Sequence, residues 1–216
     1  MAKQTKLYRR VKVWSIALRI FHWAFAFSCI ILILTGLYIN NPYYTGMEYD
    51  AFFSMGDMRY YHFTAAYIFM SALAIRIYLL FFGNRYERFT DFLPINRRNI
   101  NSLFKTITFY LYLSDERAPC PGHNPLAGTS YFVMFILGII MSLSGLYLLY
   151  PEVDWIASIG TILFGSQQTA RFWHYIFCWC FILFFIFHIY ISVWNELRSS
   201  VGLISGIING FKFEKN

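Results

Sequence analysis

Four long apolar runs constrain this chain more than any other feature. They cover residues 19–39, 60–82, 128–150 and 172–194. A helix rises about 1.5 Å per residue, so roughly 20 apolar residues cross the hydrocarbon core of a bilayer. The composition agrees, because 58% of the residues are hydrophobic and only 13% are charged, which is more apolar surface than a soluble domain of this size buries. The sequence therefore predicts an all-α membrane protein with a bundle of four transmembrane helices.

The chain contains no internal repeats, and the only substantial segment outside these runs is the loop between the second and third. We expect residues 1–216 to form a single integral membrane domain. A loop over residues 84–127 joins the second and third spans, and an apolar run over residues 201–211 is too short to cross the membrane and is expected to lie at its interface. No small-residue cleavage site follows the first run, so we expect that run to remain as a helix.

The basic residues are distributed unevenly between the two sides of the predicted bundle. Six of the 18 Lys and Arg residues lie between Lys3 and Arg19, and a second group lies in the 84–127 loop, whereas the loops on the other side hold only Arg59 and Arg171. The positive-inside rule then places both termini and the 84–127 loop in the cytoplasm. The net charge of +7 follows from this asymmetry, so we expect a lipid bilayer and no nucleic acid as a partner.

Four of the five histidines fall within the predicted spans. Ionisable residues are uncommon in spans and usually face the interior of the bundle as functional groups. His174 and His188 are fourteen residues apart in one span, so they project from nearly the same face, about 21 Å apart along the helix axis. Two imidazoles at that distance cannot share one ion. Each therefore needs a partner on another helix.

The predicted topology supplies these partners. His62 and His174 lie near the outer surface, and His22 and His188 lie near the cytoplasmic surface. Neutral imidazole is a good iron ligand, so the two pairs predict two b-type haems between the helices, with these four histidines as axial ligands of the iron. The alternatives are histidines that hydrogen-bond between helices, a shared site, or a proton relay.

An arginine precedes three of these histidines by three residues. Residues i and i+3 are neighbours on a helix, with each arginine nearer the membrane surface, where a haem places its propionates. Arginine binds carboxylates bidentately. We expect Arg59 and Arg171 to bind the propionates of the outer haem. Arg19 is the candidate at the inner haem, although a positive-inside flank explains it equally well.

Three glycines in the spans offer room for close approach. They are Gly36, Gly138 and Gly145, and the last two are seven residues apart and so share a face. Small residues in a span admit either a flat porphyrin or a neighbouring helix.

Three stretches of the sequence resemble a known family. They are "RIFHWAFAFSCIILILTG", "RFWHY" with a second histidine fourteen residues on, and "GHNPLAG" before the third span. Together they resemble the b-type cytochrome subunit of membrane-bound nickel–iron hydrogenases, within the wider formate dehydrogenase and hydrogenase dihaem cytochrome b superfamily. The resemblance covers nearly the whole chain.

The resemblance implies a dihaem quinone reductase in the bacterial cytoplasmic membrane. Its partners would be the large and small subunits of a periplasmic nickel–iron hydrogenase, with the iron–sulfur small subunit as the direct electron donor. Electrons would pass from the outer haem to the inner haem and reduce a quinone, either menaquinone or ubiquinone, near the cytoplasmic side. This turnover would be electrogenic. The hydrogen-activating site would lie on another subunit.

His123 and Asn124 are the candidate quinone site. They lie in "PGHNPLAG" just before the third span, on the side of the inner haem. A quinone site needs hydrogen-bond donors and a route for protons, which these two side chains would supply. The alternative is a turn bracketed by prolines in which Asn124 caps the third helix.

Other functions remain open at this stage. The chain would also suit a cytochrome b subunit of formate dehydrogenase or another periplasmic oxidoreductase. A stand-alone quinol-oxidising dihaem cytochrome is a further alternative, and so is a structural anchor that holds a periplasmic complex without haem.

Overall fold

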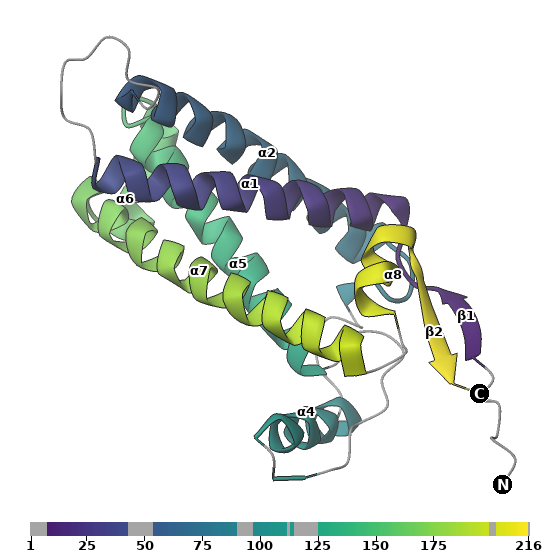
Figure 1. Cartoon of the computed structure of the whole chain (residues 1–216). Helices are drawn as coiled ribbons and strands as arrows, with labels where there is room; N and C mark the ends of the chain where they lie inside the picture. Colours follow the sequence, from purple (N-terminus) through teal and green to yellow (C-terminus); the bar gives the residue numbers. More distant parts are fainter. Residues whose placement is uncertain are drawn as a thin grey trace, which may run out of the picture. The chain divides into compact units, whose positions relative to one another are not determined.

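The computed structural model describes residues 8–42, 54–89, 97–111, 113–114, 125–198 and 202–215. Figure 1 shows the elements in these ranges, which follow one another as β1 (Tyr8–Lys12), α1 (Ile16–Asn40), α2 (Met55–Phe82), α4 (Arg97–Tyr110), α5 (Pro125–Leu149), α6 (Asp154–Phe164), α7 (Gln167–Arg198), α8 (Leu203–Asn209) and β2 (Phe211–Lys215).

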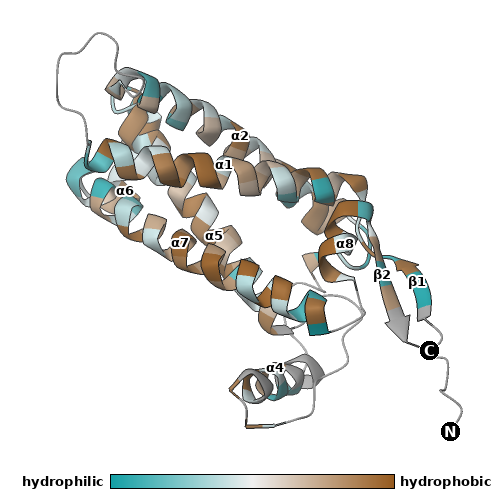
Figure 2. Ribbon diagram, in the orientation of Figure 1, coloured by the Kyte–Doolittle hydropathy of each residue, from teal (hydrophilic) through white to brown (hydrophobic). Residues whose placement is uncertain are grey.

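Four of the described helices are long and apolar enough to cross a membrane. They are Ile16–Asn40, Met55–Phe82, Leu126–Leu149 and Gln167–Arg198, and Figure 2 shows the hydrophobic colour along their middle turns. The prediction of an all-α protein with four spanning helices is therefore confirmed. Each helix begins three to five residues before its apolar run, because backbone hydrogen bonding continues where hydrophobicity stops.

A capping serine sets the start of α2 outside its apolar run. Ser54 precedes the helix, and its Oγ accepts the backbone N–H of Asp57 at 3.1 Å. The same hydroxyl donates to Asp57 Oδ2 at 2.6 Å. A serine at this position satisfies an N–H that the first turn leaves unpaired. Helix α2 therefore begins at Met55, five residues before the predicted start at residue 60.

The chain divides into two compact units, which we describe separately. The second unit comprises Ile20–Ile75 and Leu137–Phe184. Its core contains an aromatic cluster in which the ring of Phe25 lies 4.5 Å from that of Phe69 and 6.4 Å from that of Phe181, between centroids. A Cβ on Gly138 would lie 3.4 Å from side-chain atoms of Leu73 and Phe69. This glycine therefore serves helix packing, one of the two roles expected for it.

The second unit also contains α6, which the sequence analysis did not anticipate. This helix has 11 residues, so it is too short to cross a membrane. Its buried Gly160 lies against the ring of Tyr147, where an added Cβ would overlap the ring. The Tyr147 hydroxyl also lies 3.2 Å from Thr161 Oγ1. These contacts hold α6 against the end of α5.

The first unit comprises Met1–Arg19, Arg76–Ile136 and Phe185–Asn216. In it β1 pairs with β2 in an antiparallel ladder, with Arg10 opposite Phe213. The sequence predicted an interfacial apolar segment over residues 201–211. In the structure, helix α8 lies within this segment and ends at Asn209, because Gly210 adopts a left-handed conformation with φ of 89°, and the chain continues as a strand. Its location at the interface stays a prediction. The prediction of one domain over residues 1–216 stays a prediction.

A buried glutamate organises the junction before α1 in the first unit. Glu87 is 1% exposed, and its Oε1 accepts the backbone N–H of Ser15 at 2.7 Å. Its Oε2 accepts the N–H of Asn84 at 3.1 Å, and its backbone carbonyl accepts Arg76 Nη1 at 3.1 Å. The carboxylate thus completes the cap of α1, where the Ser15 hydroxyl accepts the N–H of Leu18.

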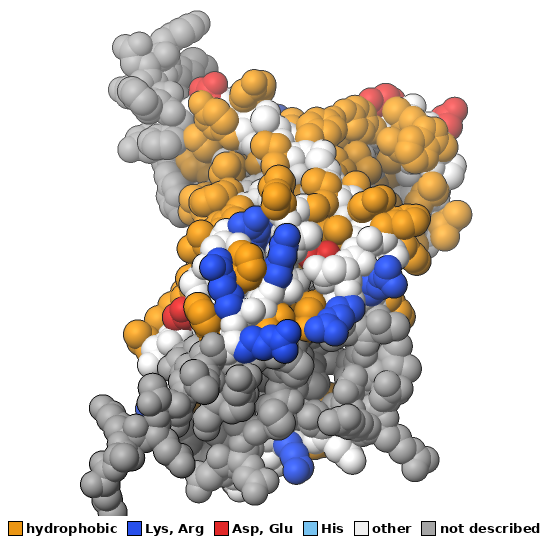
Figure 3. All heavy atoms as spheres, turned by 90° about the vertical axis from the view of Figure 1, so that its right-hand side faces the viewer, with side chains coloured by type: hydrophobic (Ala, Val, Ile, Leu, Met, Phe, Trp, Pro, Cys, Tyr) orange, Lys and Arg blue, Asp and Glu red, His pale blue; other side chains and the backbone are white. Residues whose placement is uncertain are grey.

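Figure 3 shows a face of the protein on which Lys and Arg side chains gather. In the first unit the exposed basic residues include Arg9, Arg10, Lys12, Arg85, Arg88 and Arg198. All of them come from segments that the sequence analysis placed in the cytoplasm. The orientation itself stays a prediction.

Candidate functional site

His62 and His174 both lie in the second unit, and their pairing at one haem stays a prediction. His62 is on α2 and His174 is on α7, and each stands about two turns after the start of its helix. Both rings are partly buried. The structure therefore places the two imidazoles on separate spanning helices of one compact unit.

The imidazole of His62 rests against α1. Its Nδ1 lies 2.9 Å from the hydroxyl oxygen of Thr35, a residue that is 6% exposed. The same hydroxyl donates to the backbone carbonyl of Ile31 at 2.6 Å. The neighbouring Gly36 presents no side chain to the ring, and a Cβ there would lie 3.2 Å from His62 Cε1.

The imidazole of His174 rests against α5 in the same way. Its Nδ1 lies 2.8 Å from the hydroxyl oxygen of Ser144, which is fully buried and donates to the carbonyl of Met141 at 3.0 Å. A Cβ on the adjacent Gly145 would lie 3.5 Å from His174 Cε1. A hydroxyl residue followed by glycine therefore holds each ring, from two different helices.

This donor set fits a b-type haem. Such a haem takes its axial ligands from neutral imidazoles, and ligating histidines almost always hydrogen-bond through the nitrogen that does not bind metal. In both rings Nδ1 is the hydrogen-bonded nitrogen. Nε2 is then the nitrogen through which His62 and His174 would hold the iron.

The other two histidines fall in different units, His22 in the second and His188 in the first. The ring of His22 meets that of Trp23 edge-on at 5.1 Å between centroids. His188 Nδ1 lies 3.5 Å from the hydroxyl of Tyr131 on α5, and the two rings are also edge to face at 5.5 Å. The pairing of His22 with His188 therefore remains a prediction from the sequence.

The three arginines expected at the propionates occupy different surroundings. Arg59 and Arg171 are exposed, and Arg171 Nη1 lies 3.3 Å from Gln168 Oε1 in the preceding turn. Arg19 Nη1 donates to the backbone carbonyl of Ile208 at 2.5 Å. Its Nε is buried and has no hydrogen-bond partner among the described residues. A carboxylate would satisfy that N–H, so Arg19 also keeps its proposed role.

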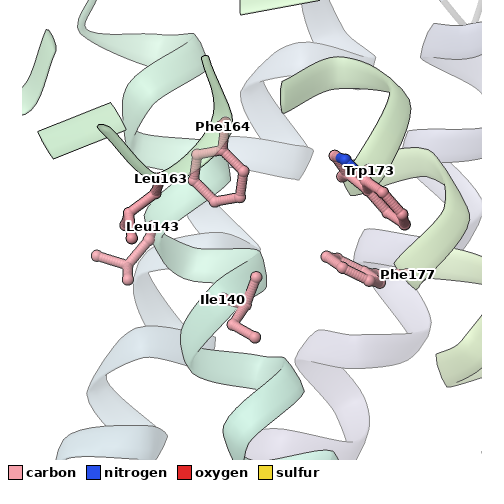
Figure 4. Close-up of a pocket in the computed structure, with 6 residues that line it drawn as sticks. All are labelled: Ile140, Leu143, Leu163, Phe164, Trp173 and Phe177. Carbon is pink, nitrogen blue, oxygen red and sulfur yellow. The ribbon is translucent and has the colours of Figure 1, made fainter. Parts of the chain in front are cut away.

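An apolar cavity of about 320 Å³ lies beside the His174 level (Figure 4). Its lining comes from three helices of the second unit, namely Ile140 and Leu143 of α5, Leu163 and Phe164 of α6, and Trp173 and Phe177 of α7. None of these lining side chains carries a charge. The cavity therefore suits an apolar chain and offers nothing to bind the propionates of a haem.

Two predicted site residues lie outside the described part of the chain, and two residues that contact the histidines were not predicted. His123 and Asn124, the candidate quinone residues, lie outside the described residues. Thr35 and Ser144 were missed, because a small hydroxyl in an apolar run changes neither its charge nor its periodicity. The signal that would have found them is the pair of dipeptides Thr35–Gly36 and Ser144–Gly145, each inside a span.

Comparison with known proteins gives a consistent set of relatives. The family model described as prokaryotic cytochrome b561 matches residues 13–210. A protein named probable Ni/Fe-hydrogenase B-type cytochrome subunit from Azotobacter vinelandii is 31% identical over 225 residues, which covers 99% of this chain and 91% of the relative. Similarly named subunits from Bradyrhizobium diazoefficiens and Escherichia coli K12 are 32% and 29% identical, over 93% and 94% of this chain and 85% and 91% of the relatives, respectively.

Proposed function

The chain belongs to the prokaryotic cytochrome b561 family, and on that premise we propose that it is the dihaem membrane subunit of a nickel–iron hydrogenase. In this function it accepts electrons from the iron–sulfur small subunit of a periplasmic hydrogenase. It delivers them to membrane quinone on the cytoplasmic side. The names of its relatives support the hydrogenase as partner.

When bound, a b-type haem supplies reversible one-electron transfer at its iron. The residues of this chain bind and orient that group. His62 and His174 offer one imidazole from each of two helices, and the hydroxyls of Thr35 and Ser144 fix their ring planes. Arg59 and Arg171 stand one turn nearer the helix starts, where they would neutralise the propionates.

His22 and His188 form the second ligand pair of the proposal. This assignment rests on their positions along the helices. His22 is near the start of α1, and His188 is in the second half of α7. With both termini on the cytoplasmic side, the pair lies at the cytoplasmic level and the His62–His174 pair at the periplasmic level. Electrons then cross the membrane between two fixed ligand pairs, which makes turnover electrogenic.

Quinone reduction requires two electrons and two protons for each quinone. We assign the quinone site to His123 and Asn124, which precede α5 on the cytoplasmic side and provide hydrogen-bond donors for the quinone oxygens. Protons enter from the cytoplasm, while hydrogen oxidation releases protons on the periplasmic side. The menaquinone or ubiquinone pool is the electron acceptor.

The observation that carries this proposal is the geometry around His62 and His174. Two imidazoles from separate spans of one compact unit are each held through Nδ1 by a buried hydroxyl. Histidines that merely joined helices by hydrogen bonds would not need a second imidazole at the same level. A structural anchor without haem would have no use for this arrangement either.

Membranes containing the chain and its co-expressed hydrogenase test the proposal. We expect hydrogen-dependent reduction of quinone that disappears in the H62A variant, while reduction of a soluble dye by the hydrogenase subunits persists. Isolation of the tagged chain should co-purify the nickel enzyme. Co-purification of a formate dehydrogenase in its place would contradict the assigned partner, and unimpaired quinone reduction by H62A would contradict the assigned route.

A further inference from the structure

The two histidines of the candidate haem site share one supporting device. Thr35 of α1 and Ser144 of α5 each place a hydroxyl oxygen within 2.9 Å of a histidine Nδ1. Each is followed by a glycine that faces Cε1 of the same ring. Nδ1 and Cε1 are adjacent ring atoms, so one edge of each imidazole lies against a hydroxyl–glycine pair.

The direction of these hydrogen bonds follows from a count of protons. A hydroxyl has one proton to donate and accepts through its lone pairs. Thr35 directs its proton to the carbonyl of Ile31 at 2.6 Å, and Ser144 directs its proton to the carbonyl of Met141 at 3.0 Å. With its proton directed to the carbonyl, each hydroxyl accepts a hydrogen bond from the histidine. The proton between the two groups belongs to the imidazole.

In this arrangement both rings carry their proton on Nδ1. With the proton on Nδ1, a neutral imidazole keeps its lone pair on Nε2. Both rings thus present the same nitrogen for metal binding, and neither needs to exchange protons to do so.

We propose that Thr35 and Ser144 are positioning residues of the His62–His174 haem site, which fix the metal-binding nitrogen of both ligands and set the redox potential of that haem. This inference rests on the proposed function, since it requires a haem at the site. An acceptor on Nδ1–H makes an imidazole more electron-donating, which favours ferric iron and lowers the potential. His188 has a different neighbour, the phenol of Tyr131 at 3.5 Å. The two predicted haems therefore have chemically different ligand surroundings.

The test uses the full chain purified with its haem and four substitutions. Thr35→Val keeps the shape of the side chain and removes the acceptor, and Ser144→Ala removes the other acceptor. Ser28→Ala and Ser142→Ala are matched controls, because these hydroxyls lie on the same two helices and bond only to carbonyls of their own helix, at 3.0 and 2.9 Å. Redox titration of the haem absorption bands and electron paramagnetic resonance are the readouts.

We expect Thr35→Val and Ser144→Ala to raise the midpoint potential of one and the same haem and to change its resonance signal. The other haem and both controls should keep wild-type values, and Thr35→Ser should restore them. Thr35→Val can also lower haem affinity, by about 10–100-fold when a ligand loses its supporting hydrogen bond. In that case one haem should be lost selectively. Unchanged potentials in both variants, or shifts of two different haems, would overturn the inference. Wild-type protein without haem would overturn the proposed function itself.

Discussion

The ring of Phe69 on α2 lies 6.1 Å from the ring of Phe181 on α7, between centroids, and the two are nearly perpendicular at 73°. Phe69 follows His62 by seven residues, and Phe181 follows His174 by seven residues. Seven residues are about two helical turns, so each phenylalanine shares a face with its histidine. The interior of the second unit thus contains the two histidines and, about two helical turns further along α2 and α7, a layer of packed phenylalanine rings.

Truncation of Phe181 tests the aromatic level. This side chain is 4% exposed, and deleting a buried phenylalanine costs about 3–5 kcal/mol in protein cores because a cavity remains. We expect Phe181→Ala to lower the unfolding temperature of the detergent-solubilised chain strongly. Leu183→Ala is the control, since Leu183 is 54% exposed on the same helix. Equal effects of the two substitutions would mean that Phe181 does not lie in a packed core.

Removal of the Glu87 carboxylate tests the junction before α1. The carboxylate accepts two backbone N–H groups and interacts electrostatically with buried Arg76. We expect Glu87→Ala to cost about 1–3 kcal/mol of unfolding free energy, because it leaves partly buried backbone N–H groups without their acceptor. Glu152→Ala, at an exposed position, should change stability by less than about 0.5 kcal/mol. Thermal unfolding followed by circular dichroism distinguishes the two; a stable Glu87→Ala protein would argue against the buried cap.

A methyl group at Gly160 tests how α6 packs. The added Cβ would overlap the ring of Tyr147, so we expect Gly160→Ala to destabilise the protein by about 1–3 kcal/mol. Gly56→Ala is the matched control, because the nearest heavy atom to its Cβ is Ser54 Oγ at 3.7 Å, an ordinary contact. That control should be neutral or stabilising, since alanine favours helix more than glycine does. A destabilised control with an unaffected Gly160→Ala would contradict the packing.

Neutralisation of Arg171 tests its role at the propionates. A positive charge near a haem favours the reduced form, so its removal lowers the midpoint potential. We expect Arg171→Gln to lower the potential of the haem held by His62 and His174, while Arg171→Lys retains most of it. The effect is limited by solvent screening, because Arg171 is exposed. Arg85→Gln, in the first unit, serves as the control in the same redox titration. A potential that rises in Arg171→Gln would exclude this role.

The sequence was most informative where the physical signal is repeated along the chain. Four apolar runs predicted the four spanning helices, because the bilayer requires a long, continuous stretch. The 14-residue separation of His174 and His188 predicted that each needs a partner elsewhere, and the structure places His62 in the same compact unit as His174. Both inferences depend on spacing within single segments, which the sequence displays directly.

Features made by two distant segments were beyond this reasoning. The ladder between β1 and β2 joins strands of five residues each, near opposite ends of the chain. Each strand has the same basic and aromatic composition as the residues around it, so neither is recognisable as a strand by itself. The contacts of Thr35 and Ser144 with histidines depend on how helices are rotated against each other. The sequence showed Gly36 and Gly145 as room for close approach, and the structure shows that the imidazole rings themselves occupy that room.

The number of haems bound by single-histidine variants tests the central claim most directly. Haem per chain should be measured by pyridine haemochrome and protein assay for the wild type and for His22→Ala, His62→Ala, His174→Ala and His188→Ala. We predict two haems in the wild type, loss of one and the same haem in the His62 and His174 variants, and loss of the other in the His22 and His188 variants. A wild-type chain with one haem, or His62 and His174 variants that lose different haems, would contradict the account.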